Sequence, residues 1–327
     1  MQHEFRYRTI GILSIAAIVA ASAITVSGQY SLTVNKERLE NARNEPQNWL
    51  LMNGDYGANR YSRLTQINRD NVGSLRMVWA LAIGGMQDTG RNGPEAELNP
   101  LVDNGYMYTS DGWGTVYKID AQAPDHAKFE WIADPGVDHE GNTSRSRGIA
   151  LWEDKVVANL PDGRVIAMDR DDGEIIWDVE VAGVTEFGRR ERFLTAPLVA
   201  DGKVLVQNGA GDGGTRGWVA ALDVDTGEEL WRFLTIARPG EPGGDTWGDL
   251  PLEFRAGADS WQAGSYDPVT GLVYMSTSQA KPWARSQRGT AGDALYTNSS
   301  LALRPATGEL EWYYQYLPGE THDMDET

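Results

Sequence analysis

Five side chains in this sequence carry oxygen donors of the kind that hold a hard metal ion. They are four carboxylates and one amide: Glu97, Asp212, Gln279, Asp323 and Asp325. Such oxygens suit Ca²⁺ or a larger trivalent cation. The chain contains no cysteine, so thiolate catalysis, disulfides and cysteine-ligated zinc or iron–sulfur sites are excluded. These five side chains therefore form a coherent set of oxygen donors for such a cation, provided that the fold brings them together.

Charge and local context exclude two other kinds of ligand. The 327 residues carry a formal net charge of −18, which repels the phosphate backbone of a nucleic acid. Residues 209–214 match the glycine pattern G-x-G-x-x-G, but in a dinucleotide-binding loop this pattern must open a helix. The residues that follow, 218–223, have the composition of a strand. We therefore expect this chain to bind neither nucleic acid nor a nucleotide.

A repeated hairpin pattern predicts the scaffold that must position these donors. An apolar strand is followed by a turn that contains Gly, and the next strand ends in Trp. Close copies occupy residues 167–177, 221–231 and 302–312, and a looser copy runs over residues 119–131. In the turn, Asp bonds back to the backbone and Gly takes a positive φ.

The spacing of the tryptophans indicates the fold class. Trp79, Trp131, Trp177 and Trp231 are 52, 46 and 54 residues apart, as expected for four-stranded propeller blades. The next gap, to Trp312, is 81 residues and accommodates one blade with a long loop. An open solenoid fits the spacing too, but a Trp at a fixed strand end favours radial blades. We predict an all-β β-propeller with about five to six blades, whose loops bring the oxygen donors together.

The N-terminal segment predicts export. Arg6 and Arg8 precede an uncharged stretch over residues 9–26, and residues 21–23 offer an A-x-A-like cleavage site. A membrane anchor is the alternative, because the stretch is close to the roughly 18 residues that span a bilayer. Both interpretations place the body of the protein in the periplasm. We divide the chain into a signal peptide or anchor at 1–28 and a propeller domain at 29–327.

A family resemblance starts just after this segment. Asn48-Trp49, the run Asn-Arg-Tyr-Ser at 59–62, and the stretch from Gln66 to Trp79 resemble the opening of the pyrroloquinoline-quinone (PQQ)-dependent methanol and alcohol dehydrogenases. The resemblance continues over residues 47–327. It implies an eight-bladed propeller, of which this chain holds part, with PQQ and a metal ion as cofactors.

The resemblance implies roles for several cofactor-binding residues. Glu97 matches a glutamate that hydrogen-bonds the quinone, and Arg147 matches an arginine that meets a cofactor carboxylate. A planar guanidinium with five donors suits a tricarboxylate. Trp261 matches the tryptophan that stacks on the quinone, and a threonine contact falls at Leu194, with Thr195 beside it.

Three positions depart from the family pattern. Asp212 replaces a metal-ligating glutamate, and Gln279 replaces a metal-ligating asparagine. Both side chains keep an oxygen that can bind a hard cation. Residues 141–142 read Gly-Asn where many family members carry two adjacent cysteines that pack against the quinone.

The segment at residues 318–325 matches the family without gaps. Asp323 falls on the catalytic aspartate, which is also a metal ligand, and His322 fills the position of a family tryptophan. Asp325 falls where lanthanide enzymes have a further aspartate and calcium enzymes have alanine. Calcium and a lanthanide ion both remain open as the metal.

The resemblance implies oxidation of an alcohol to an aldehyde. Asp323 would act as general base, the metal as Lewis acid, and electrons would pass to a cytochrome c or quinone acceptor. A non-catalytic Trp-repeat scaffold of the cell envelope and a truncated, inactive quinoprotein are the alternatives. Five or six blades would not close the family's ring, so we expect a second polypeptide or a missing C-terminal segment to complete it.

Overall fold

The computed structural model describes residues 33–84, 95–140, 142, 145–209 and 211–324. The predicted signal peptide or anchor at 1–28 lies outside these residues, as does Asp325. No helix within the described part of the chain combines the length and the apolar composition needed to cross a membrane.

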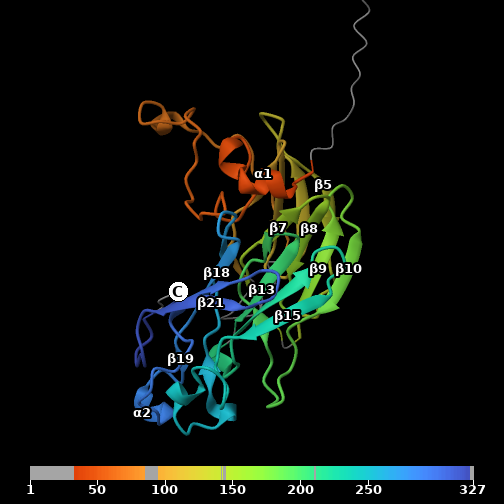
Figure 1. The fold of residues 1–327 in the computed structure, drawn as a ribbon. Helices are drawn as coiled ribbons and strands as arrows, with labels where there is room; N and C mark the ends of the chain where they lie inside the picture. Colours follow the sequence, from red (N-terminus) through yellow and green to blue (C-terminus); the bar gives the residue numbers. More distant parts are fainter. Residues whose placement is uncertain (1–32, 85–94, 141, 143–144, 210, 325–327) are drawn as a thin grey trace, which may run out of the picture. The chain divides into compact units, whose positions relative to one another are not determined.

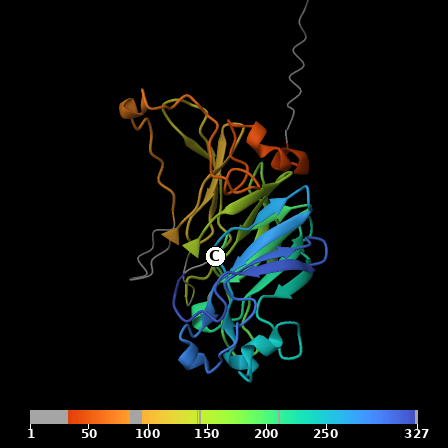
Figure 2. The same ribbon diagram turned by 60° about the vertical axis from the view of Figure 1, so that its left-hand side comes forward.

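Four antiparallel sheets contain most of the described strands; each has four strands paired in chain order, and a short fifth strand, β11, joins the third. The first contains β2 (Leu101–Asp103), β3 (Tyr106–Ser110), β4 (Val116–Asp120) and β5 (Lys128–Ala133), and the second β7 (Ile149–Trp152), β8 (Lys155–Asn159), β9 (Arg164–Asp169) and β10 (Ile175–Glu180). The third contains β12 (Leu198–Ala200), β13 (Lys203–Gly209), β14 (Trp218–Asp223) and β15 (Glu229–Leu234), and the fourth β17 (Ser265–Asp267), β18 (Leu272–Thr277), β20 (Ser299–Leu303) and β21 (Leu310–Gln315). Successive sheets lie side by side in both ribbon views (Figures 1 and 2), which confirms the prediction of propeller blades.

Short elements connect and cap the blades. Two small strand pairs are β1 (Glu95–Ala96) with β6 (Arg145–Ser146), which is parallel, and β16 (Ala256–Gly257) with β19 (Ala280–Lys281), which is antiparallel. β11 (Arg192–Phe193) pairs with the end of β13. The helices are α1 (Lys36–Glu40), α2 (Arg285–Arg288) and the 3-10 turns η1 (Ala42–Asn44), η2 (Val72–Ser74), η4 (Gly211–Gly213), η5 (Gly244–Trp247) and η6 (Leu252–Phe254).

Each predicted Trp–Gly repeat joins two neighbouring blades. The Trp of one blade lies on the turn glycine of the next, and its indole N–H donates to a carbonyl of the same turn. The three contacts are Trp131 on Gly173 with Arg170 O (3.1 Å), Trp177 on Gly227 with Val224 O (3.0 Å), and Trp231 on Gly308 with Pro305 O (2.9 Å). A Cβ at Gly227 would lie 2.7 Å from the Trp177 ring, and φ there is +74°. Glycine therefore serves both the turn and the docking contact.

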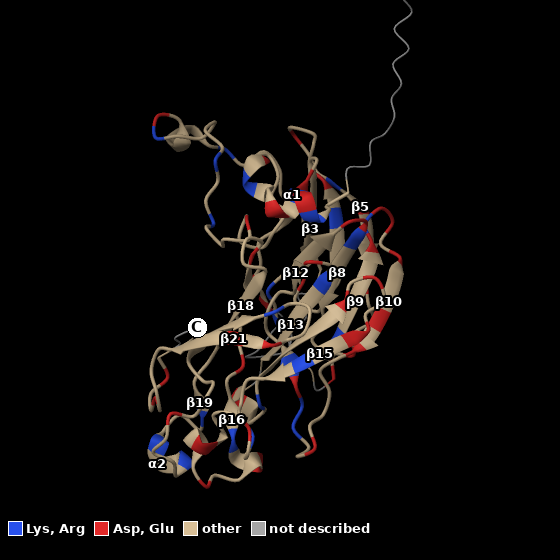
Figure 3. Ribbon diagram, viewed as in Figure 1, with Lys and Arg blue, Asp and Glu red and all other residues tan. Residues whose placement is uncertain are grey.

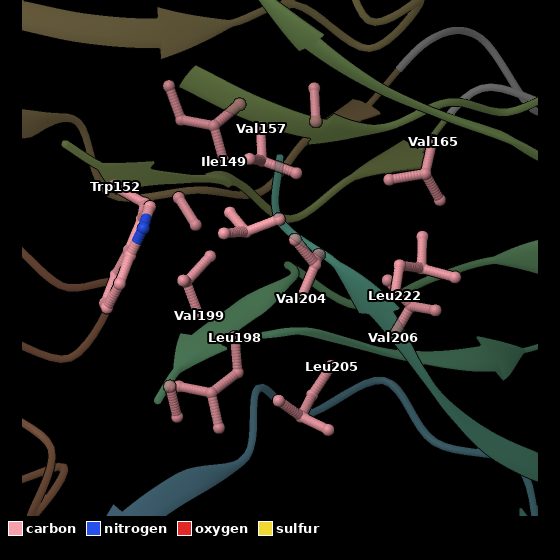
Figure 4. Close-up of a cluster of buried hydrophobic side chains, with 14 of the residues drawn as sticks. Ile149, Trp152, Val157, Val165, Leu198, Val199, Val204, Leu205, Val206 and Leu222 are labelled. Atoms are coloured by element: carbon pink, nitrogen blue, oxygen red, sulfur yellow. The ribbon is translucent and has the colours of Figure 1, made fainter. Parts of the chain in front are cut away.

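The core lies between neighbouring blades. Figure 4 shows Ile149, Val157 and Val165 of the second sheet near Val204 and Leu222 of the third. These five side chains are at most 1% exposed. Apolar residues cover both faces of the inner strands of the second and third blades because each of these blades is enclosed between two others.

The described chain contains four blades, fewer than the five or six expected. Residues 61–78 carry one short 3-10 turn, η2, and their side chains are exposed, so this stretch adds no blade. Figure 1 shows η2 extending away from the sheets. Trp79, the first tryptophan of the predicted repeat, lies in no strand. Its 52-residue spacing to Trp131 is therefore a misleading signal.

Candidate functional site

A parallel strand pair brings two predicted cofactor residues together. β1 and β6 pair Glu95 with Arg145, and the chain continues in register, so that Glu97 N donates to Ser146 O at 2.9 Å. Two nitrogens of Arg147 then converge on one oxygen of Glu97: Nε and Nη2 lie 2.9 and 2.7 Å from Glu97 Oε2. Such a pair holds both side chains in a fixed geometry.

Glu97 and Arg147 line a cavity of about 270 Å³, close to the smallest volumes common for ligand pockets (roughly 300–1,000 Å³). Trp261 also lines it, so the structure gathers Glu97, Arg147 and Trp261 around one space. Arg60 lines the same cavity, and its Nε donates to Asn53 Oδ1 at 2.9 Å. Two guanidinium groups and a half-buried indole suit a flat, anionic aromatic ligand.

The Thr195 side chain is buried and hydrogen-bonded to backbone away from the cavity. It is 4% exposed, and its hydroxyl donates to Gln207 O at 3.2 Å. Its neighbours reach the cavity: Arg147 Nη1 donates to Leu194 O at 2.8 Å, and Ala196 lines the wall. The segment therefore supports Arg147 through the Leu194 carbonyl and adds Ala196 to the cavity wall.

Two of the predicted metal and catalytic residues lie together. The Gln279 amide nitrogen donates to Asp323 Oδ1. Gln279 is 1% exposed, yet its Oε1 is buried and has no hydrogen-bond partner. A buried amide oxygen without a donor is costly unless something else satisfies it. An oxygen-seeking cation beside Gln279 and Asp323 would do so, and in this respect the residues fit a metal ion.

Asp212 is held separately. It lies in η4, its side chain is 77% exposed, and Oδ1 lies 2.8 Å from Lys281 Nζ. Within the described residues no three acidic or histidine side chains converge on one point. The full predicted set of donors, Glu97, Asp212, Gln279, Asp323 and Asp325, therefore stays a prediction. Asp325 lies outside the described residues, and so does residue 141 of the Gly-Asn pair.

Sequence analysis missed one buried carboxylate, Asp259, which supports the two loops that carry Asp212 and Gln279. Asp259 is 5% exposed; its Oδ2 accepts from Gly211 N at 2.8 Å and its Oδ1 from the Ser278 hydroxyl at 2.6 Å. Gly211 precedes Asp212 and Ser278 precedes Gln279. A Cβ at Gly211 would collide with this carboxylate, so glycine is required there.

Arg288, which was also missed, joins the segments that carry Gln279 and Asp323. It is 2% exposed, and its guanidinium donates to Pro282 O at 2.8 Å and to Glu320 O at 2.6 Å. Burial lowers the pKa of Arg288, but an arginine stays charged. Figure 3 shows basic and acidic residues interspersed around β16, β19 and α2. A buried acid shortly before Trp261 and an arginine at the end of the short helix α2 gave no sequence signal of either role.

Comparison with known proteins places this chain in a family. A profile for the PQQ family, described as the β-propeller domain of glucose, ethanol and alcohol dehydrogenases, matches residues 49–327. Quinohemoprotein alcohol dehydrogenase ADH IIB of Pseudomonas putida is 37% identical over 297 residues, covering 85% of this chain and 41% of that protein. The dehydrogenase subunit of alcohol dehydrogenase (quinone) of Gluconacetobacter polyoxogenes is 34% identical over 334 residues, 94% of this chain and 44% of its own length.

Solved structures agree with the sequence relatives. Quinohemoprotein alcohol dehydrogenase ADHIIG of Pseudomonas putida HK5 superposes with a TM-score of 0.80 at 33% identity, over 89% of this chain and 43% of that one. A europium-containing methanol dehydrogenase gives 0.78 at 28% identity, over 89% and 52%. The chain thus spans about half, or less, of these relatives' length. Because the family profile covers most of its residues, this chain belongs to the PQQ-dependent alcohol dehydrogenase family, within its β-propeller domain.

Proposed function

We propose that this chain supplies the cofactor-binding and metal-binding blades of an exported, PQQ-dependent alcohol dehydrogenase that oxidises an alcohol to an aldehyde. The observation that carries the proposal is the cavity in which Glu97, Arg147 and Trp261 meet. The family resemblance assigns these three residues to one cofactor, although they come from three distant segments of the chain. A scaffold without catalysis would have no need of that arrangement.

The chain's own groups define how the cofactor is held. Arg147 and Arg60 offer guanidinium donors to a carboxylate, and Trp261 offers a ring for stacking. Glu97 keeps Arg147 in place through its two contacts. Thr195 would act through the backbone of its segment, since its hydroxyl is engaged elsewhere.

Asp323 is the proposed general base. When bound, the quinone would accept hydride and the metal ion would act as Lewis acid on it. Asp323 would accept the hydroxyl proton of the alcohol, while the Gln279 amide, which donates to its Oδ1, orients the carboxylate. Gln279, Asp323 and Asp325 would hold the metal, with Asp212 joining them once it is released from Lys281. Electrons would leave to a cytochrome c or quinone acceptor in the periplasm.

The fourth blade offers a surface for the rest of the propeller. Trp312 stands at the repeat position of Trp131, Trp177 and Trp231, but it is 45% exposed; Tyr314 and Tyr316 near it are 61% and 49% exposed. The turn of the first blade, residues 121–127, contains no glycine to receive a Trp, so a second copy of this chain does not offer the matching turn. We propose that a further segment or a second polypeptide with a glycine-bearing blade turn covers Trp312.

The test is cofactor binding and turnover by the full chain, supplied with any completing polypeptide. The wild type should bind PQQ, followed by its absorbance, and Arg147→Met should weaken binding at least about tenfold, as expected for a lost charge-assisted pair. Asp323→Asn should leave PQQ binding nearly intact and lower turnover at least about a hundredfold. No PQQ binding by the wild type would favour the scaffold alternative, and near-normal turnover of Asp323→Asn would remove the assigned base.

A separate test concerns the metal. An extra carboxylate at Asp325 adds negative charge, which should favour a trivalent lanthanide over Ca²⁺. Reconstitution with Ca²⁺ or La³⁺ should show a preference for La³⁺ in the wild type that is reduced in Asp325→Ala. Equal preference in the two proteins would contradict the assignment of Asp325.

A further inference from the structure

Lys281 is an anchored cation at a position proposed for metal binding. It lies in β19, paired with Ala256 of β16, and it lines a cavity of about 750 Å³ together with Asp212, Trp283 and Arg288. Its side chain is 11% exposed, whereas that of its partner Asp212 is 77% exposed. The ammonium lies 4.6 Å from the centre of the Trp283 ring, a cation–π contact. Lysine is therefore the fixed member of the pair, and the aspartate is the member free to move.

The carboxylate of Asp212 cannot serve the ammonium and a metal ion equally. At 2.8 Å the ammonium of Lys281 satisfies Asp212 Oδ1 and neutralises its charge. The amide oxygen of Gln279, two residues before Lys281, stays buried and without a donor. One proposed ligand is thus engaged by a protein cation while another is unsatisfied. A metal ion that uses both must displace Lys281 from Asp212 or accept its positive charge nearby.

We propose that Lys281 is an internal cation that competes with the metal ion for Asp212 and thereby sets the metal affinity of the site. The proposal rests on the proposed function, because it takes Asp212 and Gln279 as metal ligands. Lys281 holds Asp212 in place before the metal arrives and weakens binding once it does. Because the Asp212 side of this ion pair is exposed, the pair contributes little to stability, so the main effect of Lys281 falls on the ion and not on the fold.

The experiment measures Tb³⁺ binding to the full chain by sensitised luminescence, without any alcohol turnover. Lys281→Met keeps the apolar stem against Trp283 and removes the charge, and it should bind Tb³⁺ about tenfold more tightly, the scale for one unit charge removed a few ångströms away in a partly exposed site. Lys281→Arg keeps the charge and should bind like the wild type. Asp212→Asn should bind more weakly. Lys36→Met, which breaks the exposed 2.6 Å pair between α1 and Asp201, is the matched control and should change nothing.

The outcomes separate this proposal from the proposed function. Equal or weaker Tb³⁺ binding by Lys281→Met than by the wild type overturns the competition, even if PQQ, titrated in parallel, still binds. Unchanged binding by Asp212→Asn also overturns it, because Asp212 would then not be a ligand. Failure of the wild type to bind PQQ, with the Lys281 effect on Tb³⁺ present, would contradict the dehydrogenase proposal and leave the competition standing.

Discussion

The docking of each tryptophan on the next blade's turn predicts a large difference between two equivalent positions. Trp177 is 8% exposed, lies on Gly227 and donates to Val224 O at 3.0 Å, whereas Trp312 is 45% exposed at the same repeat position. Replacing a buried Trp by Ala costs roughly 3–5 kcal/mol of unfolding free energy. The hydrogen bond accounts for about 1 kcal/mol of this, and lost packing for the rest. Trp312→Ala should cost no more than about 1 kcal/mol, since much of its ring is already in water.

Urea unfolding followed by far-UV circular dichroism measures both variants without relying on tryptophan fluorescence. We expect the midpoint of Trp177→Ala to fall well below that of the wild type, with Trp177→Phe between them because it keeps most of the ring and loses the indole donor. The midpoint of Trp312→Ala should stay close to the wild type. Similar losses for Trp177→Ala and Trp312→Ala would refute the reasoning, because the effect would then come from the strand position and not from the neighbouring blade.

Three further predictions concern stability and support of the site. Gly227→Ala should lose more unfolding free energy than Gly271→Ala. Both glycines have a positive φ (+74° and +68°), but only a Cβ at Gly227 meets a tryptophan. Equal losses would contradict the contact between Trp177 and the turn at Gly227. Asp259→Ala should cost about 2–3 kcal/mol of unfolding free energy in the same assay and weaken Tb³⁺ binding, because Gly211 N–H and the Ser278 hydroxyl lose their acceptor. Unchanged Tb³⁺ affinity would show that Asp259 does not support the loops that carry Asp212 and Gln279. The hydrogen bond from Arg38 lowers the pKa of Glu45 from 4.5, so the contribution of ionised Glu45 to the unfolding free energy is present above about pH 4.5 and is lost as pH falls through the folded-state pKa. The difference in unfolding free energy between wild type and Glu45→Gln should therefore shrink over that range. A constant difference would show that ionisation of Glu45 does not contribute to stability.

The hairpins of the blades could be predicted from the sequence because their signal is local. A turn glycine and a strand-end tryptophan recur close to each other in residues 167–177, 221–231 and 302–312. The structure adds three contacts in which a tryptophan docks on the turn of the next blade. The predicted number of blades was less accurate, since Trp79 matched the spacing but lacks the hairpin that precedes the other tryptophans. A single residue at the right interval indicates a blade only together with its turn.

The cofactor cavity could be predicted only in part. The resemblance selected Glu97, Arg147 and Trp261, and the structure brings them together. Arg60 belongs to the opening segment that carries the resemblance, yet its position on the cavity depends on a backbone with φ of +52° and on the Asn53 contact. Neither feature has a sequence pattern of its own, so a second guanidinium in the cavity could not be predicted.

The arrangement at the metal position shows why ligand identity alone does not predict a site. Asp212 and Gln279 can both bind a hard cation, but their orientation depends on residues of other chemical types. Asp259 holds the backbone next to one of them and the hydroxyl next to the other, and Lys281 competes for Asp212. A buried carboxylate must be satisfied by hydrogen bonds, and here the two donors belong to the two loops that must come together. Asp259 thus couples two segments that are distant in the sequence. A substitution there should change metal binding as directly as one at a ligand.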